Sequence, residues 1–272
     1  QMLSILQSLG CEILGNSDEM YEVMPPTWRS DITIFEDLAE EIIRIYGFDN
    51  IEPTLPTSAS QVIQLPQLSK VERKATDLFA GLGFNQCVHF SFTCPEVAEK
   101  LQLSDIKMIP VLNPIVDELS HMKTTLMGSL LDTLQKNRNQ KVSDLKLFEV
   151  ARIFEAAQLP LGGNLPTEYL VVSAVAMGPI SENTWSQKVK STDFYYMKGI
   201  AESIIKELGL VGISFEAGSH SSLHPGRTAK VLYKGSVIGW IGEIHPIVQE
   251  SFDLSLPRIY LEINLSLITD DA

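Results

Sequence analysis

Carboxylates are crowded into one short segment of this sequence, residues 28–50, which reads WRSDITIFEDLAEEIIRIYGFDN. Five of them fall within eleven positions: Asp31, Glu36, Asp37, Glu40 and Glu41. Asp37, Glu40 and Glu41 are spaced i, i+3 and i+4, which places them on one face of a helix. A hard divalent cation such as Mg²⁺ prefers oxygen ligands and would relieve the repulsion between these groups. The spacing leaves two interpretations open. One is a solvated acidic face, which is the commoner case, and the other is a metal site towards which Asp31 folds back.

The element that must position these acids is predicted to be an amphipathic helix. Its apolar stripe recurs at i, i+3, i+4 and i+7: Ala39, Ile42, Ile43 and Tyr46. Gly47 follows as a helix-ending residue. Asp37 and Glu41 form an unfavourable like-charge pair at i, i+4, which a Glu40–Arg44 pair is expected to offset in part.

Composition limits the class of protein. The 272 residues are 44% hydrophobic, enough for one small and one large domain. With 21 basic and 34 acidic residues the net charge is −13, so any contact with nucleic acid must be local. Three cysteines without a CxxC pair suit a reducing cytosol. The chain shows no signal peptide or membrane-spanning run and opens inside a helix pattern without Met, so we expect a piece of a longer protein.

The pattern of elements predicts an α+β protein in three parts. Residues 1–52 read as a small α+β domain of helix, strand, turn at 15–19, strand and acidic helix, truncated at its N-terminus. Residues 53–68 read as a linker, and residues 69–272 as the large domain. Helices are predicted in the large domain over three ranges: 70–82, 119–138 and 193–208. Strands are predicted over five: 87–92, 145–155, 169–177, 229–244 and 258–268. A Lys234-Gly235 turn makes the fourth a hairpin, and the whole indicates an antiparallel sheet flanked by helices.

Common catalytic motifs are missing from the sequence, including GxGxxG, GxxxxGK[ST], HExxH and GxSxG. His220 and His224 lie in a segment rich in Ser, Gly and Pro, which favours a loop over a zinc pair. Arg227 follows a Pro-Gly turn and could bind a phosphate, although an ion pair with an acid such as Glu243 is the commoner use. A basic island stands out in the acidic chain: Lys136, Arg138, Lys141 and Lys146. It fits either RNA phosphates or the cations of a helix C-terminus.

Six motifs carry a resemblance to a known family. They are PPTWRSDITIFEDLAEEIIRIYGFDNIEPTLP, LNPIVDELSHMKTTLMGSLLDTLQKNRNQ, LKLFEVARIF, DFYYMKGIAESI, LHPGRTAKV and IGWIGEIHP. In this order, and over nearly the whole chain, they resemble the C-terminal half of the bacterial phenylalanyl-tRNA synthetase beta chain. The resemblance implies a winged-helix-like small domain, followed by a domain like the catalytic fold of class II synthetases.

The resemblance also implies a function and a metal site. The family enzyme has two alpha and two beta chains and charges tRNA(Phe) with phenylalanine, using Mg²⁺ and ATP bound on the catalytic alpha chain. Its small domain holds Mg²⁺, in a site shared with the alpha chain, through a motif Asp-x5-Asp-x2-Glu-Glu. That motif falls here on four residues: Asp31, Asp37, Glu40 and Glu41. The metal interpretation is therefore preferred.

The large domain departs from an active class II domain. That chemistry requires an Arg on a strand-loop-strand to clamp the ATP phosphate, and a Gly-rich final strand with a second Arg. LFEVARIFE instead offers Glu149 and Arg152 out of order, and the final strand has neither feature. Lys123 stands where relatives commonly have Arg. We therefore expect no catalytic and no cofactor-binding residue in this chain.

The expected function is that of a structural and assembly module of phenylalanine-tRNA ligase, packed on the alpha chain in the cytoplasm without membrane or DNA contact. The editing, tRNA-binding and anticodon-binding modules of a full beta chain are not recognised in it. An alternative is a nucleic-acid-binding module acting through the small domain, and a rival is a self-sufficient ATP-using enzyme. Whether the basic island touches tRNA is left open.

Overall fold

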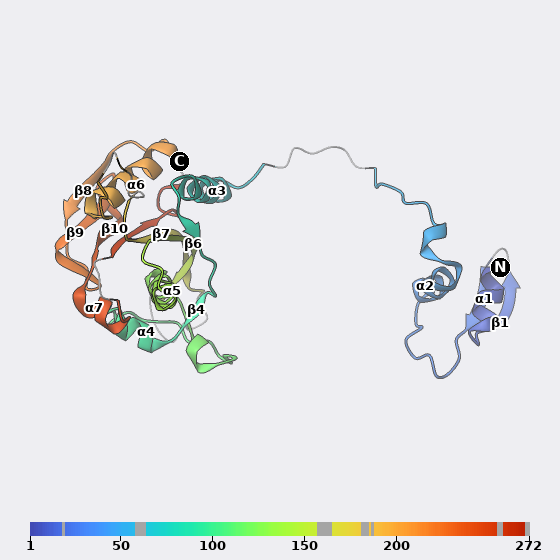
Figure 1. Cartoon of the computed structure of the whole chain (residues 1–272). Helices are drawn as coiled ribbons and strands as arrows, with labels where there is room; N and C mark the ends of the chain where they lie inside the picture. The colour runs from blue at the N-terminus through green and yellow to red at the C-terminus, as the bar shows by residue number, and fades with distance from the viewer. Residues whose placement is uncertain are drawn as a thin grey trace. The chain divides into compact units, whose positions relative to one another are not determined.

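The computed structural model describes residues 1–17, 20–57, 64–156, 165–180, 185, 188–254 and 258–269. The chain divides into two compact units, a small unit of residues 1–63 and a large unit of residues 64–272 (Figure 1). Part of the predicted linker, residues 58–63, lies outside the described residues. The finer domain boundaries stay predictions. Within the described residues, no helix combines the length and apolar character needed to cross a membrane.

As far as the structure describes it, the small unit contains two α-helices, a hairpin and a 3-10 turn. Helix α1 (Met2–Ser8) leads into strands β1 (Glu12–Ser17) and β2 (Met20–Met24), which pair antiparallel. The predicted turn at 15–19 includes positions 18 and 19, which lie outside the described residues. Helix α2 (Phe35–Tyr46) ends at Gly47, whose φ of 99° is a left-handed conformation that favours glycine, and a 3-10 turn, η1 (Phe48–Asn50), follows.

The burial of α2 differs from the prediction. Ala39, Ile42 and Ile43 are half-buried, and Tyr46 is 44% exposed. The buried residue of this helix is Glu41. A helix and a two-stranded hairpin offer too little surface to cover a full apolar stripe, so the stripe stays partly open.

A seven-stranded sheet forms the centre of the large unit as the structure describes it, in the order β3-β6-β7-β11-β10-β9-β8 (Figure 1). Its strands are β3 (Asn85–Gln86), β6 (Leu145–Glu155), β7 (Thr167–Met177), β8 (Ile213–Ala217), β9 (Leu223–Tyr233), β10 (Ser236–Ile244) and β11 (Ile259–Asn264). Only the β3–β6 pair is parallel. This confirms the predicted antiparallel sheet and α+β class.

Helices cover both faces of the sheet (Figure 1). On one face α3 (Gln67–Gly81) and α6 (Phe194–Glu207) bury a large apolar core against residues such as Phe148 and Leu261. On the other face α4 (Pro95–Lys100), α5 (Met127–Asn139) and α7 (Pro246–Ser251) lie near Val175 and Tyr260. Successive strand residues point to opposite faces, so the acids Glu149, Glu155 and Glu262 share the face of α5.

Two predicted elements of the large unit are wrong. The strand over 87–92 is replaced by β3 and by β4 (Phe92–Thr93), which pairs with β5 (His121–Met122). The helix predicted over 119–138 begins only at Met127, after a 3-10 turn, η2 (Asp117–Leu119). The β4–β5 pairing and a hydrogen bond from Lys123 N to Ser91 O hold the chain extended there, and this tertiary pairing overrides the helical spacing.

The turn between β9 and β10 and the close approach of β10 to β11 both depend on glycine. Lys234 and Gly235 have φ values of 50° and 83°, as a tight two-residue hairpin turn requires, so that prediction is confirmed. On β10, a Cβ atom at Gly239 would lie 2.0 Å from the main-chain oxygen of Glu262 on β11. Only glycine allows these two strands to approach so closely.

Candidate functional site

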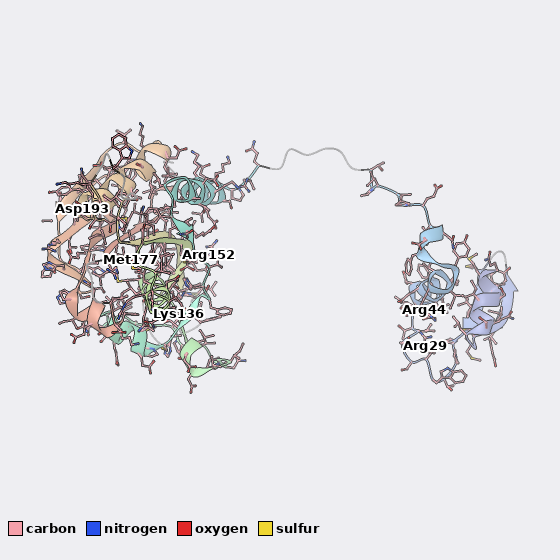
Figure 2. The ribbon with its side chains drawn as sticks, viewed as in Figure 1. Arg29, Arg44, Lys136, Arg152, Met177 and Asp193 are labelled. Atoms are coloured by element: carbon pink, nitrogen blue, oxygen red, sulfur yellow. The ribbon has the colours of Figure 1, made fainter. Side chains whose placement is uncertain are left out.

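The acidic segment of the small unit is organised around two arginines, Arg29 and Arg44, whose positions Figure 2 labels. Arg29 Nη2 donates to Glu41 Oε1 at 2.8 Å and to Asp31 Oδ2 at 2.7 Å. Arg44 donates to the second oxygen of Glu41. The expected Glu40–Arg44 pair is therefore wrong, because Arg44 turns to the buried Glu41. Glu40 is exposed.

Hydrogen bonds stabilise the charged forms of these acids. Bonds from Arg29, with a further contribution from Arg44, lower the pKa of Glu41 from 4.5 to about 2. Arg29 likewise lowers the pKa of Asp31 from 3.8 to about 2. Asp37 accepts the main-chain N–H groups of Thr33 and Ile34, at 2.7 and 3.0 Å, and these bonds lower its pKa. Asp37 thus serves as a capping residue at the start of α2.

The arrangement of these four carboxylates does not fit a formed magnesium site. Both oxygens of Glu41 receive guanidinium donors, and Oδ2 of Asp37 receives two main-chain amides. Within the described residues, no group of three or more His, Cys, Asp or Glu side chains could hold a metal ion. The metal assignment of Asp31, Asp37, Glu40 and Glu41 stays a prediction.

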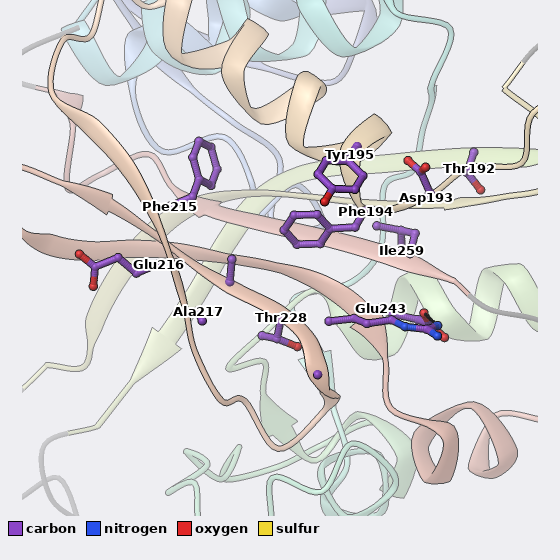
Figure 3. Close-up of a pocket in the computed structure, with 13 residues that line it drawn as sticks. Thr192, Asp193, Phe194, Tyr195, Phe215, Glu216, Ala217, Thr228, Glu243 and Ile259 are labelled. Carbon is purple, nitrogen blue, oxygen red and sulfur yellow. Dashed lines mark hydrogen bonds and ion pairs between the residues drawn. The ribbon is translucent and has the colours of Figure 1, made fainter.

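The Arg227 segment lines a cavity of about 670 Å³ in the large unit. Figure 3 shows Phe194 and Tyr195, from the start of α6, on one side of it, and Thr228 and Glu243 on the strands. Arg227 Nη1 donates to Glu243 Oε2 at 2.5 Å. The predicted ion pair is confirmed, and it uses one guanidinium nitrogen of Arg227.

A second cavity, of about 620 Å³, is lined by segment 88–94 and α5. Lys123 lines it and is 4% exposed, and its side-chain ammonium makes no hydrogen bond or ion pair with the described residues. Burial lowers the pKa of this lysine. Glu149 instead accepts the main-chain N–H of His89 and contacts its ring Nδ1, both at 2.9 Å. The sequence pointed to Lys123 and Glu149 but gave no signal for His89, which is 60 positions from its partner.

The basic residues singled out from the sequence have different surroundings. Arg138 pairs with Asp253 at 3.4 Å, and Lys146 Nζ donates to Ile180 O at 3.1 Å. Lys136 and Lys141 are exposed. Contact of Lys136, Arg138 or Lys141 with tRNA stays a prediction. The histidines His220 and His224 belong to no group able to hold a metal among the described residues, which agrees with the loop interpretation.

A third cavity, of about 320 Å³, lies on the α5 face of the sheet. It is lined by β6, β7, β11 and β10, which are neighbours in the sheet. Its charged lining residues, within the described part of the chain, are Glu155 and Glu262. Arg152 on β6, which the sequence analysis singled out beside Glu149, pairs instead with Glu168 at 3.3 Å, and both side chains are exposed.

Comparison with known proteins identifies the family. A profile for the "Phenylalanyl tRNA synthetase beta chain CLM domain" matches residues 51–265, and one for the "tRNA synthetase B5 domain" matches residues 1–48. The phenylalanine–tRNA ligase beta subunit of Syntrophus aciditrophicus is 34% identical over 99% of this chain and 34% of its own length. That of Ralstonia nicotianae is 35% identical over 97% of this chain and 33% of its length. The chain therefore spans about a third of these relatives.

Solved structures support the fold. Two structures of pyrrolysyl-tRNA synthetase from Desulfitobacterium hafniense superpose with a TM-score of 0.59 each. One is 13% identical and covers 76% of this chain and 70% of its own, and the other is 12% identical and covers 99% and 86%. The predicted class II synthetase-like sheet is confirmed. Since the first profile spans most of the sequence, the chain belongs to the phenylalanyl-tRNA synthetase beta chain family.

Proposed function

We propose that this chain is a non-catalytic assembly module of a phenylalanine-tRNA ligase beta subunit, and that it packs on the catalytic alpha chain. The names of its relatives support the ligase assignment. In the whole cytoplasmic enzyme, ATP and phenylalanine are bound by the alpha chain, and tRNA(Phe) is the second substrate. The chain described here contributes structure and contacts rather than chemistry.

The acidic cavity on the sheet carries this proposal. Class II chemistry places the ATP phosphates against arginines on the strand-loop-strand and on the final strand. Here the cavity between β6, β7 and β11 presents Glu155 and Glu262, and Arg152 is paired with Glu168 elsewhere. Two carboxylates repel a triphosphate. This face therefore disfavours ATP binding.

The surface beside Lys123 supports a docking role. Val88 and Phe90 line the second cavity and are 87% and 72% exposed. Apolar side chains gathered at a groove are typical of a protein interface. The ammonium of Lys123 is buried and has no ion pair among the described residues, so it gives this groove a positive group for a carboxylate of the partner.

The experiment is sedimentation of this chain with purified alpha chain, in Mg²⁺ and in EDTA, together with ATP–pyrophosphate exchange. We expect a complex, and exchange only in mixtures that contain the alpha chain. A Val88→Ser, Phe90→Ser double variant should weaken the complex at least about tenfold, since burying each large side chain is worth roughly 1.5–3 kcal/mol. Val211→Ser, which changes another exposed apolar residue (83%), is the matched control.

Three outcomes would contradict the proposal. They are exchange by this chain alone, the absence of any complex, or equal weakening by the control. Binding of RNA by the chain alone would instead favour the nucleic-acid-binding alternative. The Mg²⁺ and EDTA arms test the magnesium prediction separately: dependence of the complex on Mg²⁺ that Asp31→Asn abolishes would support it, and equal assembly in EDTA would remove it.

A further inference from the structure

The third cavity holds a carboxylate that is fixed in place but not neutralised. Glu262 Oε2 accepts hydrogen bonds from the hydroxyls of Tyr260 at 2.6 Å, Ser173 at 2.9 Å and Thr125 at 2.9 Å. Tyr260 and Ser173 are buried, so these donors are held by the sheet itself. Hydroxyl groups orient a carboxylate, but they bring no positive charge.

The negative charge of Glu262 has no cationic partner in the part of the chain that the structure describes. None of the ion pairs there includes Glu262. Its second oxygen, Oε1, accepts no hydrogen bond from the described residues, although the residue lines the cavity. Glu155 at the end of β6 adds a second carboxylate to the lining. The cavity is therefore suited to a cation and not to an anion.

The remaining residues that line the cavity favour a cationic ligand that also has an apolar part. Trp240 lies directly opposite Glu262 in the β10–β11 register, and Tyr169 on β7 also lines the cavity. The Trp240 ring also contacts the His220 ring, with centroids 5.1 Å apart, and Lys230 Nζ lies 5.9 Å from its centre. Aromatic rings attract organic cations through their faces and pack against apolar groups. Ile153 and Val171 extend the apolar floor. A carboxylate beside aromatic and aliphatic walls recognises an ammonium group attached to an apolar side chain.

We propose that this cavity binds a small primary amine, with its ammonium group on Glu262 and its apolar part against Trp240. The ammonium donates to Oε1 of Glu262, and the three hydroxyls hold the carboxylate in the orientation that accepts it. This inference goes beyond the assembly role and does not depend on it, because a chain that failed to bind the alpha chain would keep the same cavity.

The test is an NMR titration of the 272-residue chain with phenethylamine, followed by the signals of the added ligand and by the indole N–H signal of Trp240. We expect saturable binding of phenethylamine and at least about tenfold weaker binding of 3-phenylpropanoate, which has the same ring but the opposite charge. Equal affinity for the two ligands, or no saturable binding of either, would overturn the proposal.

Variants locate the binding. Glu262→Gln keeps an oxygen acceptor for the three hydroxyls but removes the charge. Because a charge-assisted hydrogen bond is lost, the affinity for phenethylamine should fall at least about tenfold. Glu168→Gln, which changes an exposed carboxylate outside the cavity, should leave the affinity unchanged. Equal effects of these two variants would refute the assignment of Glu262.

Two further variants test the proposed geometry even if Glu262→Gln fails to fold. Trp240→Leu removes the aromatic wall and should weaken the binding of phenethylamine several-fold. It should leave the preference for phenethylamine over 3-phenylpropanoate unchanged. Thr125→Val removes one orienting hydroxyl and should weaken binding less than Glu262→Gln does. Thermal unfolding of each variant is measured first, and wild-type affinity in both folded variants would contradict the proposed geometry.

Discussion

Glu41 in the small unit and Glu262 in the large unit are two glutamates that the fold stabilises in opposite ways. Glu41 is buried between the guanidinium groups of Arg29 and Arg44. Glu262 is held by three hydroxyl groups on the wall of a cavity. The first carboxylate is neutralised by its own chain, whereas the second is only oriented.

This difference separates a structural acid from one that is available to a ligand. Removing one of the two cations from Glu41 leaves a buried charge with only part of its compensation, so the cost falls on folding. Removing the charge of Glu262 leaves the hydroxyls able to bond to a neutral acceptor, so the cost falls on binding. The two sites can be distinguished by what each substitution damages.

The largest effect is expected for Arg29→Met, which breaks the compensation at Glu41. The melting temperature of the small unit should fall by about 8 °C, because Glu41 keeps only one guanidinium partner. Thermal unfolding with hydrogen exchange over residues 35–46 measures the change. Asp31→Asn is the matched control, since it removes the exposed partner of Arg29 and leaves both bonds to Glu41. Equal losses from the two variants would show that Glu41 is not the acid that matters.

A smaller loss is expected for Glu262→Leu in the large unit. Three hydroxyls lose their shared acceptor, and two of them are buried, which should lower the free energy of unfolding by about 1–3 kcal/mol. Urea denaturation measures this. Glu262→Gln should cost less than half as much, because its amide oxygen still accepts. If both variants are equally destabilised, the charge of Glu262 is needed for folding, and the contrast with Glu41 disappears.

The stability of the small unit is expected to depend on pH. The folded-state pKa values of Glu41 and Asp31 lie at about 2, below their ordinary values of 4.5 and 3.8. Their stabilisation is therefore complete above about pH 4.5 and is lost as the pH falls towards about 2. Unfolding of the small unit measured from pH 6 to pH 2 should show this loss, and Arg29→Met should flatten it. An unchanged pH profile in that variant would break the link to Arg29.

The smallest effect is expected for Glu168→Gln. Its pair with Arg152 is exposed on both sides, so the free energy of unfolding should change by less than about 0.5 kcal/mol. Urea denaturation provides the reference for an ion pair that is neither buried nor part of a cavity. A loss as large as that of Glu262→Leu would mean that exposure does not decide the cost.

Elements with a long, regular pattern could be predicted from the sequence. The strand of β6 falls on the predicted residues 145–155, and α6 lies within the predicted 193–208. Their apolar residues alternate or repeat over more than ten positions, so local pattern and tertiary packing agree. The start of α5 could not be predicted from the sequence, because it depends on the pairing of Met122 with Phe92 rather than on the local spacing of apolar residues.

The sites were predictable only as lists of residue types. The sequence singled out Glu41 among the acids, but its bond to Arg29 spans 12 positions of loop and helix. Glu262 was not singled out at all, because its partner Ser173 is 89 positions away on another strand. Long-range contacts between hydroxyls and carboxylates leave no periodic signal in the sequence. The cavity can therefore be recognised only from the arrangement of the strands in the sheet.

The close approach at Gly239 has a consequence for how this family can change over time. A single nucleotide change can remove the carboxylate at position 262 and leave the sheet intact. Moving the strand beneath that carboxylate is much harder, because any side chain at position 239 would collide with the backbone of the neighbouring strand. Among diverging lineages, the identity of residue 262 should therefore drift while glycine at 239 persists, so the pocket can lose or exchange its ligand without ever changing its place in the fold.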